Sequence, residues 1–178
     1  MKDYETKVAQ HPEEFAEFLA ILQRNQVRSY LEIGSQYGGS LWQAASALPQ
    51  KSKVVSIDSQ PTASLRDCIA ELNAGGYFAH LLACDSTAPT TVRLASLMAP
   101  FDCVFIDGNH TLKYVTSDWL NYGSLGRMIA FHDIAGISKP GKGRIEVPQM
   151  WDMLRKLYKH IEIIAPGSRR GIGVLWRY

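Results

Sequence analysis

The sequence has little excess charge and no long hydrophobic segment. Its formal net charge is only +2, and its basic residues are scattered except at Arg169-Arg170 and between Lys139 and Arg144, so nothing marks a nucleic-acid-binding surface. No apolar run approaches the roughly 20 residues of a membrane span, and the N-terminus lacks a basic-then-apolar stretch. We expect a cytoplasmic protein that binds neither nucleic acid nor membrane. Homo-oligomer formation stays open.

Cysteine is also scarce, and the three cysteines form no recognisable ligand pattern. Cys68, Cys84 and Cys103 show neither C-x-x-C spacing nor histidines at metal-binding spacing, and they lie within helical or strand-like stretches. This argues against both a disulfide framework and a zinc site. We therefore predict three reduced, buried thiols.

The hydrophobic pattern predicts a single α/β domain over residues 1–178. The chain is 46% hydrophobic and 20% charged, which suits one globular domain with a full core. Short apolar runs alternate with longer helical stretches, as in a parallel sheet covered on both faces. Strands are predicted at 29–33, 53–57, 78–83, 103–106, 128–131, 161–165 and 172–176, the last two as a hairpin. The predicted fold is Rossmann-like and doubly wound, a mostly parallel seven-stranded sheet with an antiparallel last strand.

Two segments depart from this alternation. Residues 12–26 place Phe15, Phe18 and Leu22 at helical spacing, which predicts an amphipathic helix within an N-terminal cap over residues 1–27. Residues 134–147 are rich in glycine, proline and basic side chains, and loops this long are unusual unless functional. Because this loop leaves a strand at its carboxyl end, it is a candidate lid over a substrate. The alternative is a disordered surface connection.

Residues 30–40 form the most informative segment: an apolar strand, a glycine turn and the start of a helix. Gly34 and Gly38 allow positive φ and let a ligand approach main-chain N–H groups. Asp58 closes the next apolar run, where a carboxylate can accept hydrogen bonds from both hydroxyls of a ribose. The spacing G-x-x-x-G-G differs from the G-x-G-x-x-G fingerprint, which disfavours a pyrophosphate cradle. The pattern predicts a nucleoside-cofactor site; the alternative is an ordinary strand-to-helix turn.

Polar side chains follow two later strands that should be neighbours. Asp107 and His110 come after residues 103–106, and His132-Asp133 follow residues 128–131. Asp107 and Asp133 would then lie within reach of one divalent ion, and two carboxylates with waters suit magnesium. His110 is the candidate catalytic base, because an imidazole accepts protons near neutral pH. Alternatively, Asp107 is a turn residue, His110 a helix cap, and His132-Asp133 a structural pair.

This series of motifs resembles that of the class I S-adenosylmethionine-dependent methyltransferases. The similarity covers most of the chain and rests on Glu32-x-Gly34-x-x-x-Gly38, Asp58, residues 83–86 and residues 101–108. It implies S-adenosylmethionine as cofactor and a seventh strand that runs against the other six. The cofactor-binding residues predicted in this way are Glu32, Gly34, Ser35, Tyr37, Gly38, Ser40, Asp58, Ser59, Asp85, Ser86 and Asp107. By the same resemblance, Asp58 would hold the ribose and Asp85 the adenine edge.

Residues 105–110 and 131–133 resemble a narrower group, the metal-dependent sugar O-methyltransferases and their cephalosporin-hydroxylase-like relatives. In that group, an aspartate at the position of Asp107 and a downstream acidic pair bind the metal. The resemblance implies Asp107, His132 and Asp133 as ligands of Mg²⁺ or another divalent ion. The first member of the pair is here a histidine, and a nitrogen ligand favours manganese, iron or zinc over magnesium.

We predict a methyltransferase that methylates a hydroxyl of a small molecule or sugar with divalent-metal assistance. A sulfonium methyl already has a good leaving group, so the enzyme must align the acceptor oxygen and remove its proton. One alternative is a cofactor-binding module without catalysis. An NAD(P)-dependent oxidoreductase is disfavoured by the missing fingerprint and the lack of a Tyr-x-x-x-Lys pair. A metal-dependent oxygenase using His110, His132 and a carboxylate is the remaining alternative.

Overall fold

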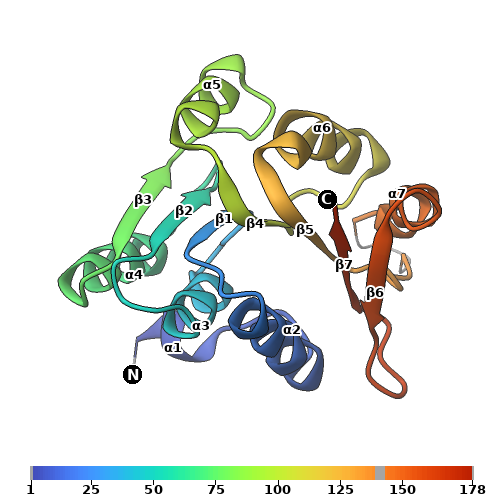
Figure 1. Cartoon of the computed structure of the whole chain (residues 1–178), viewed down its shortest axis with the longest axis horizontal. Coiled ribbons are helices and arrows are strands. Elements are labelled where there is room, and N and C mark those ends of the chain that lie inside the picture. Colours follow the sequence, from blue (N-terminus) through green and yellow to red (C-terminus); the bar gives the residue numbers. More distant parts are fainter. Residues whose placement is uncertain (1, 139–142, 178) are drawn as a thin grey trace.

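A seven-stranded sheet forms the centre of the structure, a computed structural model that describes residues 2–138 and 143–177. The strand order is β3-β2-β1-β4-β5-β7-β6 (Figure 1). The strands are β1 (Ser29–Ile33), β2 (Lys53–Ile57), β3 (Phe78–Leu82), β4 (Phe101–Ile106), β5 (Gly126–His132), β6 (Lys159–Ile163) and β7 (Ile172–Trp176). Only β7 is antiparallel to its neighbours, β5 and β6. The predicted doubly wound sheet with an antiparallel last strand is confirmed.

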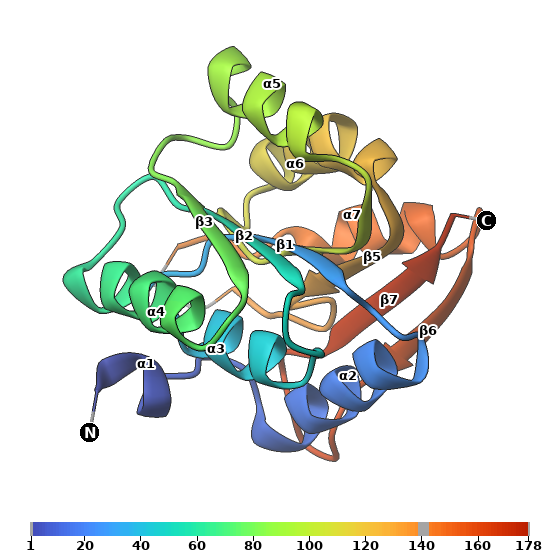
Figure 2. The ribbon, with the colours of Figure 1, turned by 60° about the vertical axis from the view of Figure 1, so that its left-hand side comes forward.

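Helices cover both faces of this sheet (Figure 2). One face carries α1 (Asp3–Thr6), α2 (Pro12–Arg24), α3 (Gly39–Ser46) and α4 (Ala63–Ala74); the other carries α5 (Pro89–Met98), α6 (Leu112–Tyr122) and α7 (Val147–Leu154). A 3₁₀ turn, Gly123–Leu125, joins α6 to β5. Side chains alternate along each strand, so Tyr30 joins the first core and Leu31 the second. The central strands are therefore apolar on both faces.

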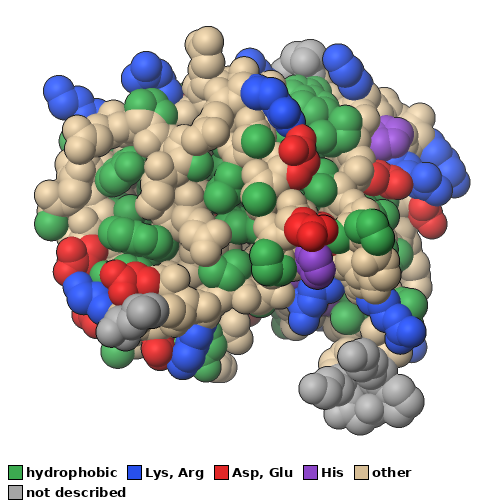
Figure 3. Space-filling model, turned by 90° about the horizontal axis from the view of Figure 1, so that it is seen from below, with side chains coloured by type: hydrophobic (Ala, Val, Ile, Leu, Met, Phe, Trp, Pro, Cys, Tyr) green, Lys and Arg blue, Asp and Glu red, His purple; other side chains and the backbone are tan. Residues whose placement is uncertain are grey.

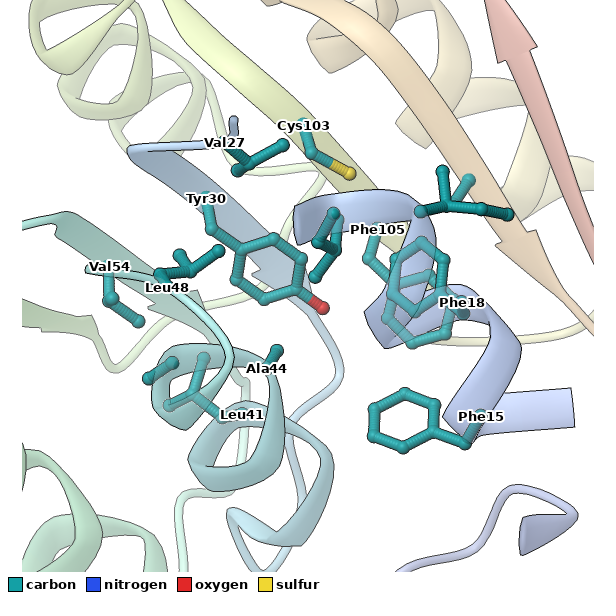
Figure 4. Packing of buried hydrophobic residues seen from close by; sticks show 14 of the residues in the cluster. Phe15, Phe18, Val27, Tyr30, Leu41, Ala44, Leu48, Val54, Cys103 and Phe105 are labelled. Carbon is teal, nitrogen blue, oxygen red and sulfur yellow. The ribbon is translucent and has the colours of Figure 1, made fainter. Parts of the chain in front are cut away.

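The N-terminal cap packs on this sheet through aromatic side chains of α2. Phe18 stacks on Phe105 of β4 with ring centroids 5.1 Å apart, and Phe15 lies 5.8 Å from Phe18. Figure 4 shows these rings beside Tyr30 of β1, and all four side chains are buried. The predicted amphipathic helix is present and ends at Arg24. This contact places the start of α2 near the carboxyl ends of the central strands.

The largest difference from the predicted strands is at β6. The apolar run at 161–165 predicts the strand two residues too late, because β6 is an edge strand whose side chains are largely exposed, Ile161 included at 36%. Its limits follow the pairing with β7, in which Lys159 faces Trp176 and Ile163 faces Ile172. The residues after Ile163 therefore belong to the β6–β7 loop, which lies close to the functional site.

The cysteines are all free thiols, but only two of them are buried. Cys68 lies on the buried face of α4, where burial raises its thiol pKa to about 12, and Cys103 lies in the interior of β4. The prediction of burial is wrong for Cys84, which is exposed. It follows β3 in a connecting loop, because that strand ends at Leu82 and not at residue 83.

On the face shown in Figure 3, acidic, basic and apolar side chains are interspersed, in keeping with a net charge of +2. None of the helices within residues 2–138 and 143–177 has the length and apolar character needed to cross a membrane.

Candidate active site

A cleft of about 670 Å³ opens at the carboxyl ends of β1, β2 and β4. Eleven of the predicted site residues line it: Gly34, Ser35, Tyr37, Ser40, Asp58, Ser59, Asp85, Ser86, Asp107, His110 and His132. Glu32 and Gly38 are not among its lining residues, and Asp133 lines an adjoining cleft instead. The volume lies within the range of small-molecule and cofactor sites. The sheet thus brings segments far apart in sequence to one edge, where open α/β sheets bind ligands.

The glycine turn after β1 has the backbone conformation that the sequence predicts. Gly34 and Gly38 have φ values of +89° and +91°. Ligand approach is the expected reason for glycine here, but close packing of the chain also requires glycine at two positions of this turn. A β-carbon on Gly34 would lie 2.4 Å from the Asp107 carbonyl oxygen, and one on Gly39 would lie 2.1 Å from the Lys7 carbonyl oxygen. These two glycines let chain segments pack closely around the cleft.

Asp58 and the glycine turn form one hydrogen-bonded unit. The carboxylate of Asp58 accepts the backbone N–H groups of Gln36 and Gln60, each at 2.8 Å. No ion pair to Asp58 occurs within the described part of the chain, and its side chain faces the cleft. Two carboxylate oxygens with about four acceptor sites retain capacity for ribose hydroxyls. The arrangement fits the nucleoside part of S-adenosylmethionine.

Glu32 lies beneath the cleft and acts on it through Ser40. Its carboxylate is fully buried and accepts the hydroxyls of Tyr30 at 2.7 Å and Ser40 at 2.8 Å. Burial raises the pKa of Glu32 to about 7, although both hydrogen bonds oppose that shift. Ser40, at the start of α3, lines the cleft. The side chain that faces a ligand here is therefore the serine.

The loop after β3 presents Asp85 and Ser86 to the other end of the cleft. Thr87 donates its backbone N–H and its hydroxyl to Asp85, both at 2.7 Å, and these bonds lower the pKa of that carboxyl. The carbonyl of Ser86 accepts the hydroxyl of Tyr122 of α6, and burial raises the pKa of Asp118 in the same helix to about 6. The loop conformation is thus fixed from both sides. Nothing in the sequence pattern singles out Asp118.

Four polar side chains gather where the neighbouring strands β4 and β5 end. Oδ1 of Asp107 lies 2.9 Å from Nδ1 of His132 and 3.3 Å from Nε2 of His110. Nδ1 of His110 lies 3.1 Å from Oδ2 of Asp133. Asp133 itself has a left-handed backbone conformation, with φ +61°. The predicted proximity of the two strand ends is therefore present in the structure.

Within this cluster, Asp107 and His132 favour each other's charged form. Burial acts to raise the pKa of Asp107, but His132 and His110 outweigh it and lower that pKa to about 2. Burial also acts to lower the pKa of His132, yet the Asp107 carboxylate raises it overall. The two shifts agree, since each partner favours the charged form of the other. Asp107 is thus an ionised carboxylate at neutral pH.

The cluster also has the geometry of a cation site. The ligand atoms of Asp107, His110 and His132 all lie within 4.8 Å of one another, and Nε2 of His132 finds no partner among the described residues. His110 thus stands in this triad where the sequence pattern places Asp133. Two imidazoles and a carboxylate suit manganese, iron or zinc better than magnesium. The donor set therefore fits a divalent ion.

Several residues at the cleft are not predicted from the sequence. Gln10, from the segment before α2, donates from Nε2 to Oδ2 of Asp107. Nζ of Lys7 lies 4.5 Å from the centroid of the Tyr37 ring. Nη1 of Arg170 lies 3.8 Å from Oδ1 of Asp133. The Arg169-Arg170 pair is visible in the sequence as a basic loop, whereas Gln10 carries no local signal at all.

The predicted lid is described only at its two flanks, because residues 139–142 of the 134–147 segment lie outside the described residues. The hydroxyl of Ser138 donates to the Ile145 carbonyl at 3.2 Å and accepts the Ile145 N–H at 2.9 Å. Glu146 donates its N–H to the carbonyl of His110 at 2.7 Å. The flanks meet each other and contact the loop that carries His110. A lid role stays a prediction.

The fold and the cleft define a class I S-adenosylmethionine-dependent methyltransferase. Residues 31–134, more than half of the chain, match a family model described as a methyltransferase domain, and the chain belongs to that family. Among curated proteins, no match to the sequence was found.

Solved structures share the fold. The O-methyltransferase TomG from Streptomyces achromogenes, in complex with S-adenosylmethionine, is 22% identical with a TM-score of 0.63, over 96% of this chain and 82% of that one. The Bacillus cereus O-methyltransferase bound to S-adenosylhomocysteine is 15% identical with a TM-score of 0.69, over 94% and 82%. Cofactor-bound Rv0187 from MTB is 16% identical with a TM-score of 0.70, over 96% and 82%. At these identities the similarity establishes the fold.

Proposed function

We propose that this methyltransferase transfers the methyl group of S-adenosylmethionine to a hydroxyl oxygen of a small molecule, and that His110 accepts the proton. The position of His110 carries the proposal. Its side chain is 28% exposed at the edge of the cleft, whereas His132 and Asp133 are 1% and 2% exposed. His110 is therefore the imidazole that an acceptor can reach.

The surroundings of His110 suit general-base chemistry. An O-methylation needs the acceptor oxygen aligned with the sulfonium methyl and freed of its proton. Asp133, 3.1 Å from Nδ1, can accept the N–H of that nitrogen and thereby leave Nε2 as the basic atom. Nε2 faces Asp107, on the lining of the cofactor cleft. The polar cluster thus lies beside the cleft in which the methyl donor would be bound.

Divalent-metal assistance is a separable part of the proposal, and the similarity of residues 105–110 and 131–133 to sugar O-methyltransferases supports it. Asp107, His110 and His132 would hold the ion, which when bound lowers the pKa of a coordinated hydroxyl. Nε2 of His110 is then a ligand and not the base. Asp133 would in that case orient His110 through Nδ1. The two versions differ in their response to chelation.

Calorimetric titration with S-adenosylhomocysteine tests the cofactor assignment. Asp58→Ala removes the carboxylate expected at the ribose, so we expect binding to weaken about tenfold or more. Asp67→Ala, which removes an exposed carboxylate on α4, serves as the control and should bind normally. An intact protein that fails to bind S-adenosylhomocysteine would overturn the assignment.

Transfer of a labelled methyl group to a panel of sugars and phenols, each paired with its amino analogue, tests the reaction. His110→Gln should retain S-adenosylhomocysteine binding while transfer to the hydroxyl compounds falls by about 10² or more. If EDTA leaves the activity of the intact enzyme unchanged, His110 is assigned as the base. If EDTA abolishes the activity and Mn²⁺ restores it, His110 is assigned as a metal ligand. Unchanged turnover by His110→Gln contradicts both. Absence of any transfer by the intact protein would favour a binding module instead.

A further inference from the structure

A second cleft, of about 310 Å³, adjoins the polar cluster. Arg170 lines both clefts, and Asp133 lines the second while contacting His110 of the first. The walls of the second cleft combine two apolar side chains, Ile137 and Ile145, with the side chains of Arg169 and Arg170. Its volume is at the lower end of the range for small-molecule sites. The cleft is therefore the size of a small ligand, and one of its lining residues, Asp133, contacts the proposed base.

The loop that carries the two arginines is held in place from both sides. The carboxylate of Glu14 in α2 is fully buried and accepts the N–H groups of Ala165 and Gly171, each at 3.0 Å. The carbonyl of Arg170 accepts the N–H of Ala135 at 2.7 Å. The buried carboxylate thus fixes both ends of the β6–β7 loop. A ligand that binds there meets a largely preorganised loop, which lowers the entropic cost of binding.

The charges in this cleft favour an anion. Its one carboxylate, Asp133, already has His110 at 3.1 Å and Arg170 at 3.8 Å as partners. Arg169 forms no ion pair with any described residue, and Nδ1 of His11, at the same cleft, finds no hydrogen-bond partner there. One guanidinium with five donors is therefore uncommitted beside an apolar wall. The planar donor arrangement of a guanidinium group is suited to binding a carboxylate or a phosphate.

We propose that this second cleft holds the methyl acceptor, and that the acceptor is an acidic small molecule with an apolar body. Ile137 and Ile145 would contact the apolar part, and Arg169 with Arg170 would bind the carboxylate or phosphate. The hydroxyl then lies at the boundary formed by Arg170 and Asp133, on the side of His110. This proposal rests on the proposed function and narrows its acceptor from small molecules in general to anionic ones.

Binding of minimal probes in the presence of saturating S-adenosylhomocysteine tests the proposal without turnover. Benzoate and phenyl phosphate carry the two candidate anions, and benzamide is the neutral control. Titrations followed by NMR should show at least one anion binding about tenfold more tightly than benzamide. Arg169→Gln should abolish this preference, and Arg93→Gln, which removes an exposed arginine on α5, should leave it intact.

Equal binding of benzamide, an unchanged preference in Arg169→Gln, or no binding of either anion would each overturn the proposal. Arg169 is exposed, so its loss should not affect folding, and the S-adenosylhomocysteine affinity of each variant verifies this. If the intact protein fails to bind S-adenosylhomocysteine, the proposed function fails. The probes then still report on the anion site by itself.

Discussion

Glu32 is the residue whose burial has the clearest energetic consequence. Its pKa rises from 4.5 to about 7 on folding, so between these values the native state binds the proton that the unfolded chain releases. The stability that Glu32 contributes is fully present below pH 4.5 and is lost as the pH rises toward 7. We expect Glu32→Gln, which retains an acceptor for Tyr30 and a donor for Ser40, to remove this loss. Denaturant unfolding should show the variant gaining about 3 kcal/mol on the wild type between pH 4.5 and 8.

The control for this measurement is Glu13→Gln, an exposed glutamate in the first turn of α2. Comparing each variant with the wild type at every pH cancels the other titrating groups. A difference between Glu32→Gln and the wild type that does not change with pH would show that Glu32 keeps an ordinary pKa in the native protein.

Single residues were predictable from the sequence where a strand end or a glycine turn marked them. Asp58 and Asp107 directly follow apolar runs, and the parallel sheet places such residues at one edge. Gln10 and Tyr122 reach the site from other segments, through hydrogen bonds of high sequence separation. Their local patterns are those of an ordinary loop and an ordinary helix. The sequence also could not show that His110, and not Asp133, completes the compact triad with Asp107 and His132.

At the scale of elements, the end of β1 and the end of β4 meet at Gly34. Both Gly34 and Gly76 have positive φ, but a β-carbon at Gly76 meets nothing within 4 Å, whereas one at Gly34 would clash with the backbone of Asp107. Gly76→Ala should therefore cost about 1 kcal/mol of unfolding free energy from backbone strain alone. Gly34→Ala should cost about 3 kcal/mol or more, because β4 must also shift.

The variants Gly34→Ala and Gly76→Ala also separate the effect of close packing from that of backbone strain on ligand binding. Displacement of the β4 end moves Asp107 and the glycine turn, so Gly34→Ala should also weaken S-adenosylhomocysteine binding in a calorimetric titration. Gly76→Ala lies at the far end of α4, beyond Gly75, and should bind normally. Equal stability of the two variants would mean that the close approach between β1 and β4 is relieved at no cost.

The whole molecule was predictable because its pattern is simple: apolar runs alternate with helical stretches, and one hairpin closes the chain. Sheet order follows from this alternation only together with the resemblance to known methyltransferases, since periodicity alone does not say which strands are neighbours. The limits of β6 were wrong for a related reason. An edge strand with exposed side chains is defined by its pairing with β7, and a hydrophobic pattern does not record pairing.

Hydrogen exchange measured by mass spectrometry tests this architecture and the cofactor site together. β1 and β4 lie in the centre of the sheet and are buried on both faces, whereas β3 and β6 form its edges, so we expect the slowest exchange in β1 and β4. S-adenosylhomocysteine at 100 times its Kd should stabilise the native state by about 2.7 kcal/mol and slow exchange throughout the core.

Local protection should appear at the same time in three separate segments, residues 34–40, 58–60 and 85–87, because loops after three different strands line one cleft. The β6–β7 loop, in which Ser168 and Arg169 line only the second cleft, should exchange as before. Asp58→Ala at the same ligand concentration, about 10 times its own Kd if binding weakens tenfold, should gain only about 1.4 kcal/mol. Protection confined to the β6–β7 loop would place the nucleoside in the second cleft, and the proposed division between cofactor and acceptor would then be reversed.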